Sequence, residues 1–347
     1  MTTTADRETF GVEELAICLS HYDLGIIRTI EEFARGSRRA PKLVLNADRG
    51  KFLFKRRARG KDDLPKVAFT HEIQLSLAAQ NFPLPHLIGT RNDNNSLLVL
   101  NSHIYELFEY IEGEGYDGSL ESTFHSGRIL GLYHKLLKEF HSVYKPPTGS
   151  YHNAKAIHQA IHNTTSSLPI ESRPPIEVLS KTVQSLEDAY LFCAEETNEL
   201  GLKDWGVQIV HGDWHPGNML FRDKHVVAVI DYDAARLQQR VIDLANGAIQ
   251  FSILGGGDDP SKWPDYLDKT RFKRFMRGYD SVNVVSVAEI KAIPYLMCEA
   301  MIAEAVLPIA ATGSFGRMQG FAFLQMIDRK VKWVLANRQE LYAVLQE

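Results

Sequence analysis

Residues 211–233 constrain the fold of this 347-residue chain more than any other segment. A polar loop at 211–218 contains a proline and a glycine, which suit a tight turn because proline fixes φ and glycine accepts positive φ. Two apolar stretches, 219–221 and 226–230, follow with a short polar turn between them. The pattern predicts a β-hairpin that returns Asp231 to the loop from which the hairpin starts.

Three side chains of this segment form a set suited to phosphoryl transfer. An attacking hydroxyl needs a carboxylate that orients it and takes its proton, and a metal ion across the phosphates needs oxygen ligands. Asp213 is the candidate base, and Asn218 and Asp231 are the candidate Mg²⁺ ligands. His211 is interpreted as a loop-bracing residue. An ordinary polar loop before a hairpin would combine these residues only by chance.

The run His-Gly-Asp-x-x-x-x-Asn, an apolar strand and Ile-Asp-x-Asp resembles the aminoglycoside phosphotransferase and choline kinase superfamily, including homoserine kinases of the protein-kinase-like type. Protein kinases use a similar set of a catalytic aspartate and metal-binding residues, but they have arginine where Gly212 stands and continue with Asp-Phe-Gly. The resemblance implies an α+β, bilobal protein-kinase-like fold with an N-terminal five-stranded antiparallel sheet plus a helix. It places the nucleotide-binding lobe at 1–112, the hinge at about 108–113, and a mainly helical catalytic and substrate-binding lobe with the hairpin at 113–347.

The pattern of residues along the N-terminal part agrees with that fold. A short amphipathic helix is predicted at 12–22 and a second helix at 64–80, where apolar residues recur at helical spacing. The five strands are predicted at residues 26–33, 41–46, 51–57, 96–101 and 103–110. Further helices are predicted at residues 127–141, 290–306 and 317–335, with another beginning at Asp243.

The nucleotide site is predicted around the third strand. Lys55 is the candidate to hold the α- and β-phosphates of ATP, and Leu53 shares its face and would cover the adenine. The resemblance implies that Glu72 of the following helix pairs with Lys55. It also implies that backbone groups of Glu109 and Ile111 at the hinge meet the adenine edge.

The turn between the first two strands departs from the protein kinases because it lacks Gly-x-Gly-x-x-Gly. Ser37 and Arg38 are the candidates to touch phosphate there. The segment 35–66 is rich in lysine and arginine although the chain has a net charge of −4. A local basic cluster in an acidic chain favours a polyphosphate ligand over nucleic acid.

The acceptor is predicted to be a small molecule. Only 243 − 231 = 12 positions separate Asp231 from the helix at Asp243, which leaves no room for the segment that receives a peptide in protein kinases. If the acceptor carries an amine, a carboxylate or an aromatic face should meet it. The candidates are Glu299, Glu304, Trp214 and Tyr232, with a solvated surface acid or a helix-internal ion pair as the alternative for the two glutamates.

Composition bears on the compartment. The three cysteines have no metal-ligand spacing, and the apolar stretch at 301–311 is interrupted by a glutamate and a proline. A cytoplasmic protein without a membrane partner is expected, and its oligomeric state stays open.

The favoured interpretation is an ATP- and Mg²⁺-dependent kinase whose acceptor is the hydroxyl of a homoserine-, choline- or amino-sugar-like metabolite. Two alternatives stay open. The first is an aminoglycoside-type antibiotic phosphotransferase, and the second is a non-catalytic nucleotide-binding pseudokinase with a structural or regulatory role. The joint presence of Lys55, Asp213, Asn218 and Asp231 argues against the second, because a lapsed enzyme has no chemical reason to keep all four.

Overall fold

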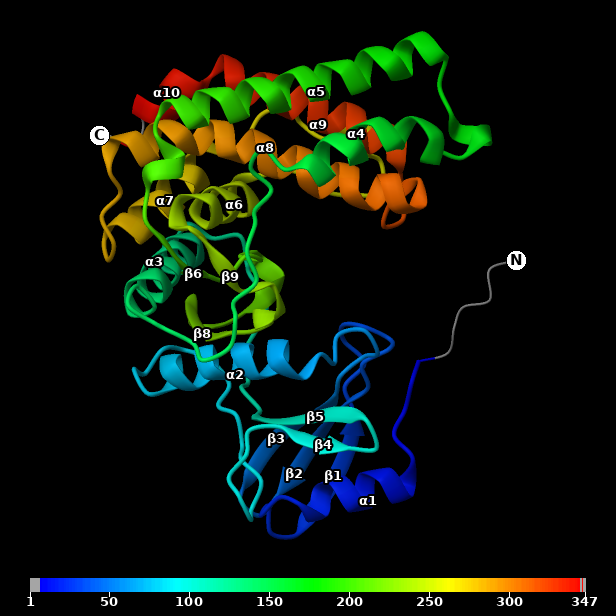
Figure 1. Cartoon of the computed structure of the whole chain (residues 1–347), viewed down its shortest axis with the longest axis vertical. Helices are drawn as coiled ribbons and strands as arrows, with labels where there is room; N and C mark the ends of the chain where they lie inside the picture. The colour runs from blue at the N-terminus through cyan, green and yellow to red at the C-terminus, as the bar shows by residue number, and fades with distance from the viewer. Residues whose placement is uncertain (1–6, 344, 346–347) are drawn as a thin grey trace.

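Five antiparallel strands form a sheet at one end of the computed structural model, which describes residues 7–343 and 345 (Figure 1). The strands lie in the order β1-β2-β3-β5-β4. The predicted five-stranded antiparallel sheet, and with it the predicted fold class, is confirmed. Their bounds are β1 (Ile27–Glu32), β2 (Lys42–Ala47), β3 (Gly50–Arg56), β4 (Leu98–Leu100) and β5 (His103–Glu109).

The two faces of β3 differ in burial. Phe52 and Phe54 are buried in a small core that also contains Tyr105 of β5 and Cys18 of α1 (Val12–Ser20). Leu53 and Lys55 alternate with these phenylalanines and are only half-buried. Because side chains alternate across a strand, Leu53 and Lys55 share the face away from that core, as predicted.

Helix α2 (Leu64–Ala78) lies between the sheet and the rest of the molecule (Figure 1). Asp63 caps its start by accepting a hydrogen bond from the Lys66 N–H. The apolar side of the helix, with Phe69 and Ile73, joins the large core of the C-terminal lobe. The lobes are therefore packed together through this helix.

Two short antiparallel pairs carry the motif that the sequence singled out. The predicted hairpin is formed by β7 (Met219–Arg222) and β8 (His225–Val229). A second pair, β6 (Val207–Val210) and β9 (Arg236–Gln239), flanks it and was not predicted. Each strand of that second pair has four residues, too few for an alternation pattern to stand out.

Helices make up the other end of the molecule, where α4, α5, α8 and α9 run side by side (Figure 1). The first helix of this lobe was predicted to start at residue 127. It starts seven residues earlier, at Leu120, because the Ser119 side chain caps it. The bounds of all eight α-helices that the described residues form in this lobe are α3 (Leu120–Leu136), α4 (Lys155–Ser167), α5 (Ile176–Glu199), α6 (Arg240–Ser252), α7 (Lys269–Asp280), α8 (Val287–Thr312), α9 (Gly320–Ala336) and α10 (Arg338–Ala343).

Helix α8 is the central helix of this lobe. Among the described residues it is the one helix long and apolar enough to cross a membrane by length and composition, and 78% of its most apolar stretch is buried inside the fold. It packs against α4, α5, α6 and α9.

Candidate active site

One carboxylate, that of Asp243, stabilises the loop between β6 and β7 through hydrogen bonds to its backbone. Asp243 of α6 accepts hydrogen bonds from the backbone N–H groups of His211 at 3.0 Å and Gly212 at 2.9 Å. Gly212 has a φ of 76°, and a Cβ at this position would lie 2.5 Å from the Ala234 carbonyl oxygen. The loop conformation therefore requires glycine here. His211 is buried among aromatic rings, which fits its predicted bracing role.

Asp213 and Asn218 lie together at the end of this loop. The Nδ2 of Asn218 donates to the carbonyl oxygen of Asp213 at 3.0 Å and to its Oδ2 at 2.9 Å. The Asp213 side chain is 46% exposed, and its Oδ1 has no hydrogen-bond partner among the described residues. That oxygen is free to meet a hydroxyl.

The surroundings of Asp213 keep it charged. Burial raises the pKa of this carboxyl, but His215 and Asn218 outweigh burial and hold the pKa below its ordinary value. The Nε2 of His215 lies 3.6 Å from Oδ2 of Asp213, and its Nδ1 accepts from the Gly217 N–H at 3.0 Å. With a proton on Nε2 the ring donates to Asp213 and accepts at Nδ1, and the hydrogen bond to Asp213 raises the pKa of His215. Asp213 is thus ionised at neutral pH, as a base must be.

The hairpin brings Asp231 back beside Asn218. The backbone N–H of Ile230 donates to the Asn218 carbonyl at 3.0 Å, so the next residue, Asp231, lies at the same end of the hairpin. Asp231 has a φ of 64°, in the left-handed region that aspartate tolerates better than most residues. Its side chain is exposed. The sequence prediction that these residues converge is supported by this geometry.

Lys55 has a different partner from the one expected. Its Nζ lies 3.2 Å from Oε2 of Glu106 on β5, whereas Glu72 accepts a hydrogen bond from Ser142. The expected Lys55–Glu72 pair is therefore wrong. Helix α2 presents His71 to the sheet instead, and the Nε2 of His71 donates to Oε1 of Glu106 at 2.8 Å. Successive helix residues point about 100° apart, so Glu72 faces another way.

Glu106 is the centre of a charged network that the sequence reading missed. It is 0% exposed and also accepts from Arg57 at 2.8 Å. Burial raises the pKa of Glu106, but the charges of Lys55 and Arg57 outweigh it and hold the pKa well below its ordinary value. Arg57 also reaches Asp233, two residues after Asp231, at 2.9 Å. The network thus joins the lysine of the sheet to the motif on the other lobe.

A second lysine, also missed, lies beside Lys55. Lys42 is directly opposite Lys55 in the β2–β3 ladder, and its Nζ donates to the Arg35 carbonyl at 3.3 Å. Burial and the charge of Lys55 lower the pKa of Lys42. The sequence could have indicated this pair, because the turn before Gly50 sets the register of the two strands and so places Lys42 opposite Lys55. Two cations on one face favour a polyanionic ligand.

The turn that precedes β2 holds the other two phosphate candidates. Ser37 and Arg38 are both exposed, and the Ser37 hydroxyl accepts from the Arg39 N–H at 3.2 Å. The serine therefore stabilises its own turn. Contact of either residue with phosphate stays a prediction.

Of the two residues predicted at the hinge, only Ile111 has a free backbone N–H among the described residues. The N–H of Glu109 donates to the His86 carbonyl at 2.8 Å and is not available to a ligand. Neither backbone group of Ile111 has a hydrogen-bond partner among the described residues. Ile111 is therefore the residue whose N–H can meet an adenine edge.

Three of the four acceptor candidates are buried in the core. Trp214 and Tyr232 are 0% and 3% exposed and pack around His211, so neither offers a face to a cation. Glu299 is 0% exposed and accepts from the ring of His152 at 2.9 Å. These three predictions are wrong because the side chains point into the helical core.

Glu304 is the one acceptor candidate of the four that is not buried. Its side chain is exposed, and Gln250 donates to it at 2.7 Å. The atoms packed around its carboxyl, together with the negative charge of Asp213, raise the pKa of Glu304 to about 7. A role for Glu304 toward an acceptor stays a prediction.

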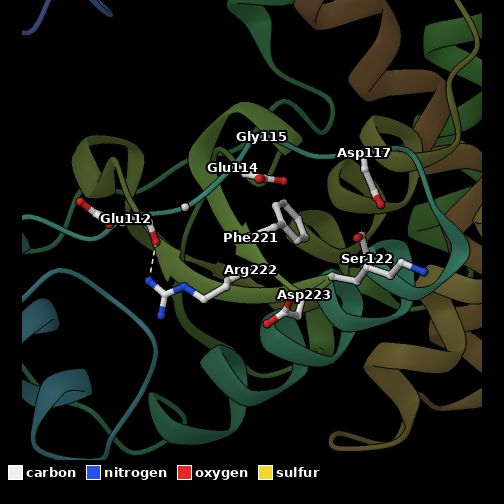
Figure 2. A pocket seen from close by; sticks show the side chains of 10 residues that line it. Glu112, Glu114, Gly115, Asp117, Ser122, Phe221, Arg222 and Asp223 are labelled. Atoms are coloured by element: carbon white, nitrogen blue, oxygen red, sulfur yellow. Dashed lines mark hydrogen bonds between the residues drawn. The ribbon is translucent and has the colours of Figure 1, made fainter.

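A cavity of about 540 Å³ lies at the predicted hinge, and none of these side chains lines it. Figure 2 shows the carboxylates of Glu112, Glu114 and Asp117 around it, with Phe221 of β7 between them. Phe221 exchanges backbone hydrogen bonds of 2.8 and 2.9 Å with Glu114, and Arg222 donates to the Glu112 carbonyl at 2.6 Å. These hydrogen bonds join the β7–β8 hairpin to the predicted hinge, and the cavity lies between the two segments.

Several solved structures that resemble this chain in fold are small-molecule kinases or phosphotransferases. The chain is similar to a microcompartment-associated aminopropanol kinase, with a TM-score of 0.69 and 12% identity over 95% of this chain and 98% of that one. It is similar to an aminoglycoside phosphotransferase from Alicyclobacillus acidocaldarius, with a TM-score of 0.67 and 14% identity over 99% and 98%. It is also similar to an amicoumacin kinase solved with AMP-PNP and Ca²⁺, with a TM-score of 0.66 and 10% identity over 93% of both chains.

No curated protein matches the sequence significantly. The sequence model of the phosphotransferase enzyme family, abbreviated APH, matches residues 29–279, which include Lys55, Asp213, Asn218 and Asp231. This match covers more than half of the chain and confirms the resemblance seen in the motif. The chain belongs to the phosphotransferase enzyme family.

Proposed function

We propose that this protein is an ATP- and Mg²⁺-dependent kinase that transfers the γ-phosphate to a hydroxyl of a small, amine-bearing metabolite. The observation that carries the proposal is the arrangement of Asp213, which is ionised, has a free Oδ1, and lies beside Asn218 and Asp231. Lobe boundaries at the predicted hinge, residues 108–113, are part of the proposal. The three cysteines are free and buried, in keeping with the expected cytoplasmic setting.

The N-terminal lobe would hold the nucleotide. Lys55 and Lys42 supply two positive charges on one face of the sheet, and Ile111 supplies free backbone groups at the hinge. Leu53, on the face of Lys55, would cover the adenine. The amicoumacin kinase of the same fold was solved with AMP-PNP, which supports nucleotide binding but not the individual contacts.

Asn218 and Asp231 fit a magnesium site that is completed by the ligand. Among residues 7–343, no three His, Cys, Asp or Glu side chains gather as a metal cage. The Nδ2 of Asn218 is engaged by Asp213, which leaves its Oδ1 free beside the exposed Asp231. Mg²⁺ commonly takes one or two protein oxygens together with phosphate and water, and when bound it would neutralise charge on the transferring phosphate.

Asp213 would act as the general base. Its Oδ1 accepts the proton of the acceptor hydroxyl as that oxygen bonds to the γ-phosphorus, and the bond from the γ-phosphorus to the bridging oxygen of ADP breaks. Glu304 would neutralise an amine of the acceptor. The same feature fits an aminoglycoside-type antibiotic kinase, which is the second candidate.

A panel of acceptors tests the proposal. Mg²⁺-dependent ADP release is measured with homoserine, choline, ethanolamine, amino sugars, methylthioribose and aminoglycosides, and chelation of the metal should abolish it. Acceptor-stimulated release names the substrate class and separates a metabolic kinase from a resistance enzyme. ATP binding without release across the panel would instead favour the non-catalytic alternative.

A further inference from the structure

Three lysines share one face of the N-terminal sheet and differ in their counter-charges. On β3, the Nζ of Lys51 lies 3.0 Å from a carboxylate oxygen of Glu112, and the Nζ of Lys55 lies 3.2 Å from one of Glu106. Lys42 on β2 is directly opposite Lys55, yet it has no carboxylate within ion-pair distance among the residues that the structure describes. Lys42 is therefore a cation of this face without a counter-charge.

The ammonium group of Lys42 lies against the turn between β1 and β2. Its Nζ donates to the Arg35 carbonyl at 3.3 Å, which leaves two of its three N–H groups without a partner among the described residues. Gly36 has a φ of 82°, and a Cβ at this position would lie 2.7 Å from the Nζ of Lys42. The turn can therefore pack this closely on the ammonium group because residue 36 has no side chain.

The surroundings of Lys42 favour the binding of an anion. The side chain is half-buried, and a buried cation without a counter-charge costs free energy. Burial and the positive charges of Lys55 and Arg7 lower the pKa of Lys42, although the negative charge of Asp231 opposes them. A polyphosphate on this face would supply the missing negative charge.

The turn indicates which phosphate Lys42 meets. In protein kinases a glycine-rich turn covers the phosphates, and the lysine of the third strand pairs with the α- and β-phosphates. The turn of this chain lacks that motif, and Lys42 follows it as the first residue of β2. Two neighbouring cations repel each other and so bind different phosphate oxygens. With Lys55 proposed at the α- and β-phosphates, the γ-phosphate is left for Lys42.

We infer that Lys42 contacts the γ-phosphate of ATP and raises the affinity for ATP relative to ADP. Its ammonium group takes the place of the backbone N–H groups that a glycine-rich turn would supply. Two of its N–H groups meet the γ-phosphate while the third keeps the Arg35 carbonyl, so one side chain joins the turn to the nucleotide. The inference rests on the proposed nucleotide site and assigns a selective role within it.

Calorimetry with AMP-PNP and with ADP, each with excess Mg²⁺, tests the inference without any acceptor. Lys42→Met should weaken AMP-PNP binding by about tenfold or more, the worth of a charge-assisted contact, and ADP binding by no more than about twofold. Lys55→Met should weaken the binding of both nucleotides. A loss of the same size for both nucleotides in Lys42→Met, or no loss for either, would overturn the inference.

Gly36→Ala tests the same contact from the turn. The methyl group would displace the ammonium group of Lys42, so AMP-PNP affinity should fall much as it does in Lys42→Met. In the Lys42→Met background the same substitution should cost less AMP-PNP affinity than in the parent protein, because both changes remove one contact. Fully additive losses would show that the turn and Lys42 act separately, against the inference.

Two further variants control for charge and for folding. Lys181→Met removes an exposed lysine of α5 and should change the affinity for neither nucleotide. Lys42→Arg keeps a cation and should retain more AMP-PNP affinity than Lys42→Met. Lys42→Met should not lower Tm, because it removes a half-buried charge that has no counter-ion. A lowered Tm with equal losses for both nucleotides would show that Lys42 has a structural role alone.

These outcomes separate the inference from the proposed function. A loss confined to AMP-PNP in Lys42→Met, without ADP release from any acceptor, would keep the inference and refute the kinase. Acceptor-stimulated ADP release by a protein whose Lys42→Met variant binds AMP-PNP as the parent does would refute the inference alone.

Discussion

Lys55, Arg57 and His71 converge on one buried carboxylate, that of Glu106. Removing a single partner from a buried charged cluster leaves the others uncompensated, which costs more than the pair is worth when complete. The position of Lys55, and with it the proposed phosphate site, depends on this one residue.

Glu106→Gln is predicted to lower the free energy of unfolding by about 3 kcal/mol. It should also raise KM for ATP by about tenfold or more, because Lys55 loses the counter-charge that positions it. Urea unfolding and steady-state kinetics measure the two effects. Glu72→Gln is the matched control and should change stability by no more than about 0.5 kcal/mol. A larger effect of Glu72→Gln than of Glu106→Gln would show that the expected helix glutamate positions Lys55 after all.

Glu304 predicts a pH dependence for a cationic acceptor. The pKa of Glu304 is raised to about 7, so its ionised fraction rises as pH increases from 6 to 8. Two pH units centred on a pKa take that fraction from about a tenth to about nine tenths. KM for an amine-bearing acceptor should therefore fall across this range, and Glu304→Gln should abolish the fall. A KM that rises with pH, or the same profile in the variant, would contradict this role.

The loop and hairpin are the elements that the sequence predicts best. A proline, a glycine and two apolar stretches at 211–230 determine the turns locally, so the convergence of Asp213, Asn218 and Asp231 followed from spacing alone. The pairing of β6 with β9 joins residues that are about 30 positions apart, and four-residue strands give too little pattern to predict their register.

Gly212→Ala tests whether the loop conformation matters. The residue has a φ of 76° and no space for a Cβ against Ala234, so alanine should displace the loop. A residue forced into such a conformation costs about 1–3 kcal/mol of stability, and kcat should fall by about a hundredfold as Asp213 moves. Gly206→Ala is the control, since a Cβ there meets nothing within 4 Å and should change little. Equal kcat values for the two variants would show that the loop tolerates the change.

Across the whole molecule, the lobes are joined by contacts that no local pattern encodes. Arg57 of the sheet region reaches Asp233 at 2.9 Å, and the Val229 N–H donates to the Pro83 carbonyl at 2.9 Å. The sequence predicted two lobes, but side-chain direction in the packed molecule decides which residues meet. The same holds for Trp214, Tyr232 and Glu299, whose residue types fit an amine although they point into the core.

Asp233→Asn should loosen this connection without disturbing Glu106. The loss of one charge-assisted hydrogen bond is worth about 1.5 kcal/mol or more, and KM for ATP should rise by a smaller factor than in Glu106→Gln. Thermal unfolding and nucleotide titration measure both quantities, with the exposed turn variant Asp223→Asn as control. An ATP affinity equal to that of the control would show that the Arg57–Asp233 pair has no part in nucleotide binding.

The most direct test of Asp213 as the catalytic base compares kcat and nucleotide affinity in Asp213→Asn. Asparagine keeps the shape of the side chain but cannot take a proton, so kcat for the best acceptor should fall by about 10²–10⁴-fold. The dissociation constant for AMP-PNP should stay within about twofold, because the nucleotide is held by other residues. A variant that retains the kcat of the parent protein would show that Asp213 is not the base, and the site proposed for phosphoryl transfer would be wrong.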